Sequence, residues 1–484
     1  MKFDRDWKWI LAIVLAGFLV YANSLGGSFV YDDNRQIGRN PLIQNLSLAG
    51  AALTSDVWAF KGDGKYTASN YWRPTFVSWM ILNYRVFGLN PFGWHVTNIL
   101  LHLGVCVLGF LLLRRFGFSD TPSFVAALLF AVHPVHAESV AWISGSTDLL
   151  FALCLLASLW FAENRRRGGN FADLALSMIL YALALGSKEV AIACLPVYYI
   201  LFSRTEDDGF RLWSPAALRA TAGFVLVAGV YFAARWAVLG AITRPVENPV
   251  PLADAFFSIP TVFVFYLKQL VFPYTLSINY PLRATTGFGF FEFILPLLVT
   301  LAVAGVVILL ARRDFRFLIG TTLFFLPLVA AFNLTAFPAD QIVHDRYLYL
   351  SVLGFLMMIL AAVGDRLSAR SLLIAAAVLA VPLSIATFAM NRVWSSDLTL
   401  WTNAAAVDPH SASTMSQYGS ALAAAGKPKE AVDAFNAALE ISPNPGAFVG
   451  RAQALIATER FEEAVWDLQT VTEMKNDNLN AYTL

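Results

Sequence analysis

Long apolar runs alternate with short polar connections through the first 390 residues of the chain. About 20 consecutive apolar residues are enough for a helix to cross a lipid bilayer. The pattern therefore predicts a bundle of membrane-spanning helices, some of them short enough to end at a cavity. The predicted segments are 7–25, 94–113, 121–136, 148–162, 172–187, 189–203, 217–239, 291–311, 317–333, 347–364 and 371–390.

A further apolar run, 255–272, is ambiguous. It contains Lys268 and Pro260, and Pro273 follows it directly. Clusters of Lys and Arg collect on the cytoplasmic side of a membrane, so their positions help to count the crossings. The clusters of this chain all fall on one side only if 255–272 does not cross. We therefore predict eleven transmembrane helices, a cytoplasmic N-terminus, and 255–272 as a re-entrant or interfacial segment on the outer side.

Beyond about residue 391 the pattern becomes polar, rich in Ala and helical in period. The pairs Asp408-Pro409, Ser442-Pro443 and Asn476-Asp477 recur 34 residues apart. A 34-residue helix–turn–helix period with small residues at the helix crossings is typical of tetratricopeptide repeats. Two repeats are readable and 480–482 is a candidate start of a third, so we expect the array to be cut short or completed by a partner.

The chain thus divides into a polytopic membrane domain, 1–390, and an α-solenoid of repeats, 391–484. Composition agrees with this division, because 58% of the residues are hydrophobic and only 14% are charged. A soluble protein of this size carries about a quarter charged residues. The formal net charge of +1 argues against a nucleic-acid partner. All three cysteines fall in apolar segments, so neither a disulfide nor a Cys-based metal site is expected.

Two adjacent acids, Asp32 and Asp33, follow directly after the first apolar segment. A carboxylate where the chain leaves the membrane can bind a metal or take a proton from a substrate. The alternative is a solvated loop, because charged residues must lie outside the apolar core. Position alone leaves both interpretations open.

A second predicted outer loop contains His133, His136 and Glu138 within six residues, and Asp148 follows at the start of the next helix. Two histidines and a glutamate are potential metal ligands, but they are equally suited to a hydrogen-bonded loop that anchors two helix ends. No fourth ligand is fixed by the spacing. We therefore expect no metal and no other cofactor, with a divalent metal as the less favoured possibility.

Cations on the outer side run against the charge bias, and Lys188 and Arg346 are two of them. In a structural interpretation Lys188 pairs with the neighbouring Glu189, and Arg346 pairs with the neighbouring Asp345. In a functional interpretation these cations bind an anionic headgroup, such as the phosphate of a lipid-linked donor.

Several motifs, in order along the chain, are similar to those of one known family. They are Phe29-Val30-Tyr31-Asp32-Asp33, Tyr71-Trp72-Arg73-Pro74, Gly93-Trp94-His95-Val96-Thr97-Asn98 with Leu101-His102, Ala131-Val132-His133-Pro134-Val135-His136-Ala137-Glu138, Asp148, Ser187-Lys188-Glu189, Asp345-Arg346-Tyr347-Leu348-Tyr349-Leu350, and the terminal repeats. This combination resembles the transmembrane O-mannosyltransferases with tetratricopeptide repeats, which modify cadherins in animals and sit in the C-type membrane glycosyltransferase superfamily (GT-C). The likeness covers nearly the whole chain, and it departs in the short tail and in region 205–290.

The resemblance implies a polyprenyl-phosphate-linked sugar as donor, with a mannose-like hexose favoured. The acceptor would be a hydroxyl of a protein or glycan, reached from the outer side. An alcohol has a pKa far above neutrality, so a base must take its proton as the new bond forms. The family acid is similar in position to Asp32 or Asp33; Asp32 is favoured, with Asp33 tuning its pKa or holding it in place.

The leaving lipid phosphate needs cations, and the resemblance suggests Arg346, Lys188 and Arg73, in that order. The other polar residues of these loops are expected to line the acceptor or the sugar. They are His133, His136, Glu138, Asp148, Glu189 and His344. The repeats would present or select the acceptor by binding a peptide or protein. The short loops and brief tail favour a bacterial inner membrane, with the repeats in the periplasm.

Two other classes of function remain as alternatives. A non-catalytic membrane scaffold would recruit partners through its repeats, and it would tolerate Asp32→Asn. A transporter of lipid-linked sugars would carry charged residues along a pathway through the membrane. The charged residues of this chain cluster at outer helix ends instead, and the sequence shows no internal inverted repeat.

Overall fold

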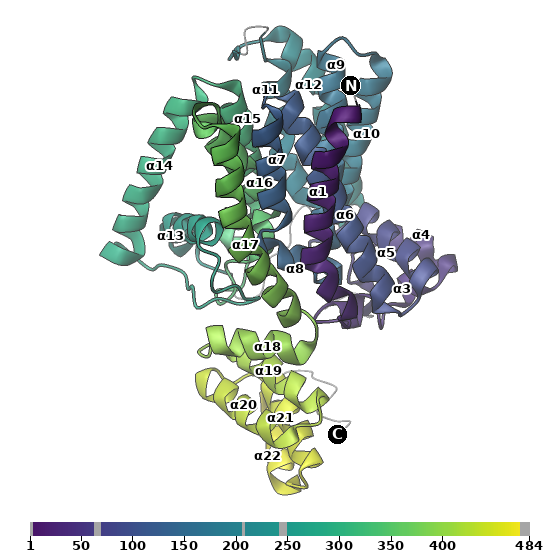
Figure 1. Ribbon diagram of the computed structural model, residues 1–484. Coiled ribbons are helices and arrows are strands. Elements are labelled where there is room, and N and C mark those ends of the chain that lie inside the picture. The colour runs from purple at the N-terminus through teal and green to yellow at the C-terminus, as the bar shows by residue number, and fades with distance from the viewer. Residues whose placement is uncertain (1–2, 62–68, 206–208, 242–248, 475–484) are drawn as a thin grey trace.

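The computed structural model describes residues 3–61, 69–205, 209–241 and 249–474, and every regular element in these ranges is a helix. Figure 1 shows a bundle of long helices with a stack of shorter helices beyond one of its ends, toward the C-terminus. The helical class predicted from the sequence is confirmed.

The helices of the bundle are α1 (Phe3–Tyr21), α2 (Asp33–Gln36), α3 (Pro41–Gln44), α4 (Ala49–Leu53), α5 (Pro74–Phe87), α6 (Pro91–Arg115), α7 (Asp120–Ala131), α8 (Ala137–Val140), α9 (Ser146–Arg166), α10 (Phe171–Ser187), α11 (Leu195–Phe202), α12 (Pro215–Leu239), α13 (Leu252–Val271), α14 (Leu295–Ala311), α15 (Phe315–Leu328), α16 (Tyr349–Val363) and α17 (Ala369–Val393). Short 3₁₀ turns join them where the candidate site residues lie. These turns are η4 (Pro134–His136), η5 (Ile143–Gly145), η6 (Glu189–Cys194) and η10 (Asp345–Leu348).

Apolar side chains cover the outside of the bundle as well as its inside. Only 17% of the apolar window of α14 is buried, and the share is the same for α17. Leu298, Leu309 and Val378 on these helices are more than half exposed. A helix that is apolar all round and not covered by protein is typical of a helix in lipid. The chain is a multi-pass membrane protein.

The number of spans differs from the predicted eleven. Within the described ranges, nine helices are long and apolar enough to cross a membrane, or ten if the pair Asp120–Ala131 and Pro134–Val140, bent by 50°, is one span. The predicted segments 172–187 and 189–203 form the shorter helices Phe171–Ser187 and Glu189–Phe202, because Lys188 interrupts the apolar run. The length and composition of α13, by contrast, do meet the requirement.

The basic clusters meet at one end of the bundle, as the charge pattern predicts. Arg114 forms an ion pair with Asp6 near the N-terminus. Arg316 pairs with Asp365 at 2.6 Å, and its guanidinium lies 5.4 Å from the ring of Phe118. We call this the basic end, and we call the opposite end, next to the C-terminal helices, the tail-side end (Figure 1).

Helix α13 lies along the tail-side end. Just before it, Pro249 forms an isolated β-bridge with Pro338. Near its C-terminal end, the Gln269 side chain donates a hydrogen bond to Asp345 Oδ1 at 3.1 Å. Because Pro338 and Asp345 belong to the same connection between α15 and α16, both ends of α13 contact one loop. Figure 1 shows α13 crosswise to α1 and α17. This position fits a segment that does not cross the bundle.

The C-terminal part, which we call the tail, contains five helices packed in sequence up to residue 474, where the described residues end. They are α18 (Asp397–Val407), α19 (Ala412–Ala424), α20 (Pro428–Ile441), α21 (Pro445–Ala457) and α22 (Phe461–Glu473). Small residues allow close crossings, because a Cβ at Gly419 or Gly450 would meet the Phe435 ring at 3.0 Å or 2.5 Å. The pairs α19–α20 and α21–α22 follow the two predicted repeat units, whereas Asn476-Asp477 and 480–482 lie outside the described residues.

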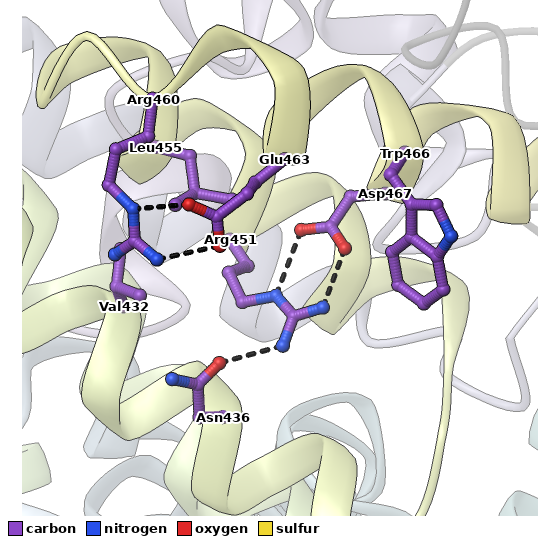
Figure 2. A pocket seen from close by; sticks show the side chains of 8 residues that line it. All are labelled: Val432, Asn436, Arg451, Leu455, Arg460, Glu463, Trp466 and Asp467. Atoms are coloured by element: carbon purple, nitrogen blue, oxygen red, sulfur yellow. Dashed lines mark hydrogen bonds and ion pairs between the residues drawn. The ribbon is translucent and has the colours of Figure 1, made fainter.

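The last two helices are held by one buried ion pair. Figure 2 shows Arg451 of α21 between Asn436 and Asp467, and its guanidinium donates to both Asp467 oxygens at 2.6 Å and 2.9 Å. Loss of one partner of a buried pair leaves the other charge without compensation, at a cost of about 3–5 kcal/mol. We expect Arg451→Met to lower the free energy of opening of α22 by about that amount, measured by hydrogen exchange in the full chain.

Arg460→Met is the matched control for this prediction. Arg460 pairs with Glu463 in the same pocket, but their side chains are 48% and 58% exposed (Figure 2). An exposed pair is screened by water and contributes little to stability, so the control should leave the exchange of α22 nearly unchanged. Equal effects of the two substitutions would contradict the prediction.

Candidate active site at the tail-side end of the bundle

The first loop turns sharply at Tyr31, immediately before the two acids. The φ angle of Tyr31 is 55°, a left-handed conformation that side chains larger than glycine rarely adopt. Its backbone N–H donates to Asp397 Oδ1 of the tail at 2.7 Å, and its ring lies 5.7 Å from both Trp142 and Trp401. Such a conformation persists only where the surroundings hold it, and here bundle and tail both do so.

Asp33 is fully buried and anchors the loop to η5. Its Oδ1 accepts hydrogen bonds from the Ser144 N–H at 2.8 Å and the Ser144 hydroxyl at 2.5 Å. Its Oδ2 accepts from the Val30 N–H at 3.2 Å. Burial raises the pKa of Asp33 to about 7 against the effect of these donors. Since three donors occupy this carboxylate, its position is suited to holding the loop.

Asp32 differs from Asp33 in its hydrogen bonding. Within the described ranges its carboxylate has no hydrogen-bond donor, and it does not cap the helix that it precedes. Burial raises the pKa of Asp32 to about 6, although Arg346, Lys61 and Arg35 lower it through their charges. An acid that is desolvated, near cations and not hydrogen-bonded has the properties of a general base.

Three buried or half-buried ion pairs contain the other predicted charged residues of the site, and Arg346, in one of them, acts on Asp32 through its charge. They are Arg346 with Glu138 at 2.5 Å, Lys188 with Asp148 at 2.5 Å, and Arg73 with Glu189 at 2.8 Å. Each predicted phosphate-binding cation is thus paired with a predicted substrate-lining acid. The alternative interpretation, with Lys188 on Glu189 and Arg346 on Asp345, is wrong, because side chains of adjacent residues in a helical turn point apart.

Aromatic rings bring the pairs into one cluster. The Lys188 Nζ lies 4.9 Å from the centre of the Tyr347 ring, and the Arg346 guanidinium lies 5.7 Å from the same ring. Arg346 also lies 5.8 Å from the Trp142 ring, which contacts Tyr31. The cluster therefore reaches from Lys188 through Tyr347 and Arg346 to the loop that carries Asp32.

The fold of the second loop depends on Gly145 at the end of η5. A Cβ at this position would lie 2.7 Å from the Glu138 carbonyl oxygen and 2.8 Å from that of Ser139. Any larger residue would push η5 away from α8. The glycine thus keeps Ser144, the anchor of Asp33, close to Glu138, the partner of Arg346.

Asp345 is a buried acid that was not chosen from the sequence as a site residue. It accepts hydrogen bonds from the Tyr280 hydroxyl at 2.5 Å and from Gln269 of α13 at 3.1 Å. The carboxylate thereby ties α13 and the loop after it to η10, which carries Arg346. Only its position next to Arg346 in the sequence could have indicated that Asp345 belongs to the site.

His133, His136 and His344 are all buried, and their substrate-lining role stays a prediction. His133 Nε2 donates to the Leu270 carbonyl at 3.1 Å, and its Nδ1 accepts from the Val135 N–H at 3.4 Å. His136 is fully buried among aromatic rings, with Phe130 at 4.4 Å. His344 is buried and its Nδ1 lies 3.3 Å from the Ile278 carbonyl. Across the described ranges, His, Cys, Asp and Glu form no group of three able to hold a metal.

The tail contributes to the site more than the sequence indicated. Val30, Trp142 and Ile278 of the bundle pack with Trp394 and Trp401 in one apolar cluster. Asp397 of α18 accepts from both the Tyr31 N–H and the Asn34 side chain, at 2.7 Å and 2.8 Å. The sequence assigns Trp394 and Trp401 to the tail alone, because nothing local in it relates them to Tyr31.

A known family model covers part of the chain that carries the candidate site, but not Asp32 or Arg346. The model of the family described as dolichyl-phosphate-mannose-protein mannosyltransferase matches residues 73–240. That range begins at Arg73 and includes Glu138, Asp148, Lys188 and Glu189.

Two curated proteins are similar over most of this chain. Protein O-mannosyl-transferase TMTC1 of Homo sapiens is 28% identical over 493 residues, which cover 89% of this chain and 55% of that protein. Protein O-mannosyl-transferase Tmtc3 of Drosophila melanogaster is 27% identical over 543 residues, which cover 95% and 58%. The chain thus spans little more than half the length of these relatives. The resemblance predicted from the sequence motifs is confirmed.

Solved structures with a similar course of the chain also exist. ArnT from Cupriavidus metallidurans, bound to undecaprenyl phosphate, has 17% sequence identity and a TM-score of 0.42, with 96% of this chain and 79% of that chain covered. The Archaeoglobus fulgidus oligosaccharyltransferase tethered to an acceptor peptide has 15% identity and a TM-score of 0.45, with 79% and 55% covered.

Proposed function

We propose that this relative of the O-mannosyl-transferases is itself a membrane glycosyltransferase, which moves a mannose-like hexose from a polyprenyl phosphate to a Ser or Thr hydroxyl of an extracytoplasmic protein. The observation that carries the proposal is the charge layout at the tail-side end. Asp32, with no hydrogen-bond donor in the described ranges, interacts with Arg346, and Lys188 and Arg73 belong to the same cluster. The names of the relatives support the sugar and the acceptor.

The reaction in this proposal is a direct displacement. Asp32 takes the proton of the acceptor hydroxyl while the hydroxyl oxygen attacks C1 of the sugar. The bond between C1 and the phosphate oxygen breaks, and the lipid leaves as a phosphate monoester. The new bond forms on the opposite face of C1, so the configuration at the anomeric carbon is inverted.

Arg346, Lys188 and Arg73 stabilise the charge that grows on the leaving phosphate. Arg346 is the first of these, because its pair with Glu138 occupies only Nη1 of the guanidinium among the described contacts. Arg73 uses both Nε and Nη2 on Glu189. Glu138, Asp148 and Glu189 orient the cations and line the sugar side of the site.

The basic end faces the cytoplasm in this proposal, and the tail lies on the other side of the membrane. Helix α13 lies in the interface, the tail forms tetratricopeptide repeats, and a bacterial inner membrane is the proposed location. A C-terminal alkaline phosphatase fusion in a bacterial host should then be active. An inactive phosphatase fusion, together with an active cytoplasmic reporter at the same site, would reject this orientation.

The function is tested by incubating the purified protein in lipid nanodiscs with polyprenyl-phosphate sugars and a Ser/Thr-rich peptide. Mass spectrometry is expected to detect a hexose on the peptide with the mannose donor, and none with a nucleotide-linked mannose. Failure of every lipid-linked sugar to react would overturn the proposal and favour the scaffold alternative.

We also expect the reaction to be independent of divalent metals, because three side-chain cations are available for the leaving phosphate. Addition of EDTA to the same reaction should leave the initial rate within about twofold of the untreated rate. A rate abolished by EDTA and restored by Mg²⁺ or Mn²⁺ would show that a metal supplies the charge instead.

A further inference from the structure

A cleft of about 830 Å³ opens between the bundle and the tail. One wall comes from the connection before α16, at Asp340 and Gln341, and the other from α19, at Ser416 and Gln417. Tyr31 also lines it, directly before Asp32 in the chain. Its volume is within the range of about 300–1,000 Å³ that is usual for ligand sites. The cleft is therefore large enough for a ligand and continuous with the loop of the proposed base.

Hydrogen bonds and an ion pair between bundle and tail hold the two walls of the cleft together. Asp340 accepts from the Ser413 hydroxyl at 2.7 Å, and the Asn279 side chain donates to the Thr414 hydroxyl at 2.9 Å. Arg283 pairs with the buried Asp408 at 2.8 Å. Because these contacts fix α19 on the bundle, the cleft is a built feature of the fold.

The lining of the cleft suits an extended polypeptide. An unfolded peptide brings unpaired N–H and C=O groups, and these need donors and acceptors along their path. Across the described ranges the Gln417 side chain and the Gln341 Oε1 atom have no hydrogen-bond partner, and the Tyr31 and Trp401 rings offer apolar contact. The Asn444 amide is already used, because it caps α21 and donates to the Ser442 carbonyl. The hydroxyl oxygen of Ser416 is buried and has no hydrogen-bond partner in the described ranges.

A second pocket, in the tail alone, does not offer these features. Its volume is about 280 Å³, and Figure 2 shows that its charged groups are directed at one another. Arg451 is bound to Asp467 and Asn436, and Arg460 is bound to Glu463. These groups stabilise the helix packing and are not available for a ligand, so the bundle–tail cleft is the stronger candidate.

We infer that the bundle–tail cleft binds the acceptor as an extended polypeptide and passes its hydroxyl side chain along Tyr31 to the loop of Asp32. This inference rests on the proposed transferase function and adds that one acceptor site is shared by α19 and the connection before α16. It predicts that residues flanking the acceptor Ser or Thr contribute to recognition.

The test compares acceptors of two lengths. In the wild type, kcat/KM should rise at least tenfold from N-acetyl-threonine amide to an eight-residue peptide with one central Thr. Gln417→Trp fills the cleft with a bulky side chain and should remove most of this gain. Ser420→Trp is the matched control, because Ser420 is also exposed on α19 but does not line the cleft, and it should keep the gain.

The inference is overturned if kcat/KM still rises tenfold with peptide length in Gln417→Trp. It is also overturned if Ser420→Trp loses this rise to the same extent. Binding can be followed without turnover by placing Gln417→Cys in a Cys154→Ser background, because Cys106 and Cys194 are buried whereas Cys154 is partly exposed. The eight-residue peptide should slow maleimide labelling of Gln417→Cys at least threefold, but not of Ser420→Cys. If neither acceptor is glycosylated but the peptide still protects Gln417→Cys from maleimide, the proposed function is wrong and the cleft remains a peptide-binding site. If the peptide gives no protection, the cleft is not its binding site.

Discussion

Asp32→Asn is expected to lower kcat for sugar transfer by about 10²–10⁴-fold, the usual contribution of a general base. The amide cannot accept the hydroxyl proton, but it has nearly the same size and keeps the loop in place. The measurement is the initial rate with polyprenyl-phosphate mannose and a Thr peptide. Wild-type activity of this variant would contradict the assignment.

The same variant is expected to be more stable than the wild type at pH 7.5. Burial raises the pKa of Asp32 from 3.8 to about 6, so the folded protein favours the protonated form. A raised carboxyl pKa contributes stability that is present below about pH 4 and is lost as the pH rises through about 6. Removing the charge should therefore raise the free energy of unfolding by about 1–3 kcal/mol, seen as a higher thermal midpoint in detergent.

The pH dependence of sugar transfer follows from the same raised pKa of Asp32. A base must be deprotonated to act, so kcat/KM of the wild type should rise with pH and level off above about 6. Asp33→Asn serves as the contrast, because it weakens the hydrogen bonds to Ser144. It should reduce activity less than Asp32→Asn. The opposite order of activities would assign the base to Asp33.

The arrangement of the basic end could be predicted from the sequence because charge is costly in lipid wherever it occurs. Arg114 and Arg316 had to leave the bilayer, and the bias of neighbouring loops placed both at one end. The same reasoning selected Lys188 and Arg346 as exceptions at the opposite end. Hydropathy was less reliable for counting helices. The predicted span 172–187 forms a helix of only 17 residues, whereas 255–272, predicted not to cross, forms one of 20 residues that is long and apolar enough to do so.

The partners of the site residues could not be predicted, because each ion pair joins distant parts of the chain. Arg346 and Glu138 are 208 residues apart, and Arg73 and Glu189 are 116 apart. One of the two interpretations of the sequence paired Lys188 and Arg346 with their neighbours, and the fold excludes that pairing. The contact between Trp401 and Tyr31 could not be predicted either, because an apolar residue in a repeat is expected to pack within the repeats.

The second large effect is expected at Arg346. Loss of one preorganised donor at a developing negative charge costs about 10²–10³-fold in kcat, and Arg346→Gln should reach this range. The substitution also leaves Glu138, only 2% exposed, without its cation. A loss of stability of about 3–5 kcal/mol should therefore accompany the loss of rate. The single variant alone does not distinguish a cation that binds phosphate from one that only holds Glu138.

The charge swap Arg346→Glu with Glu138→Arg separates the two roles. It restores an ion pair between η10 and α8, so much of the lost thermal stability should return. The guanidinium then projects from α8 instead of η10, away from the Tyr347 ring that Lys188 shares with Arg346. If Arg346 binds the donor phosphate, kcat should remain at least about 10²-fold below the wild type despite the recovered stability. Recovery of both stability and rate would show that the pair is only structural, and the phosphate would then depend on Lys188 and Arg73.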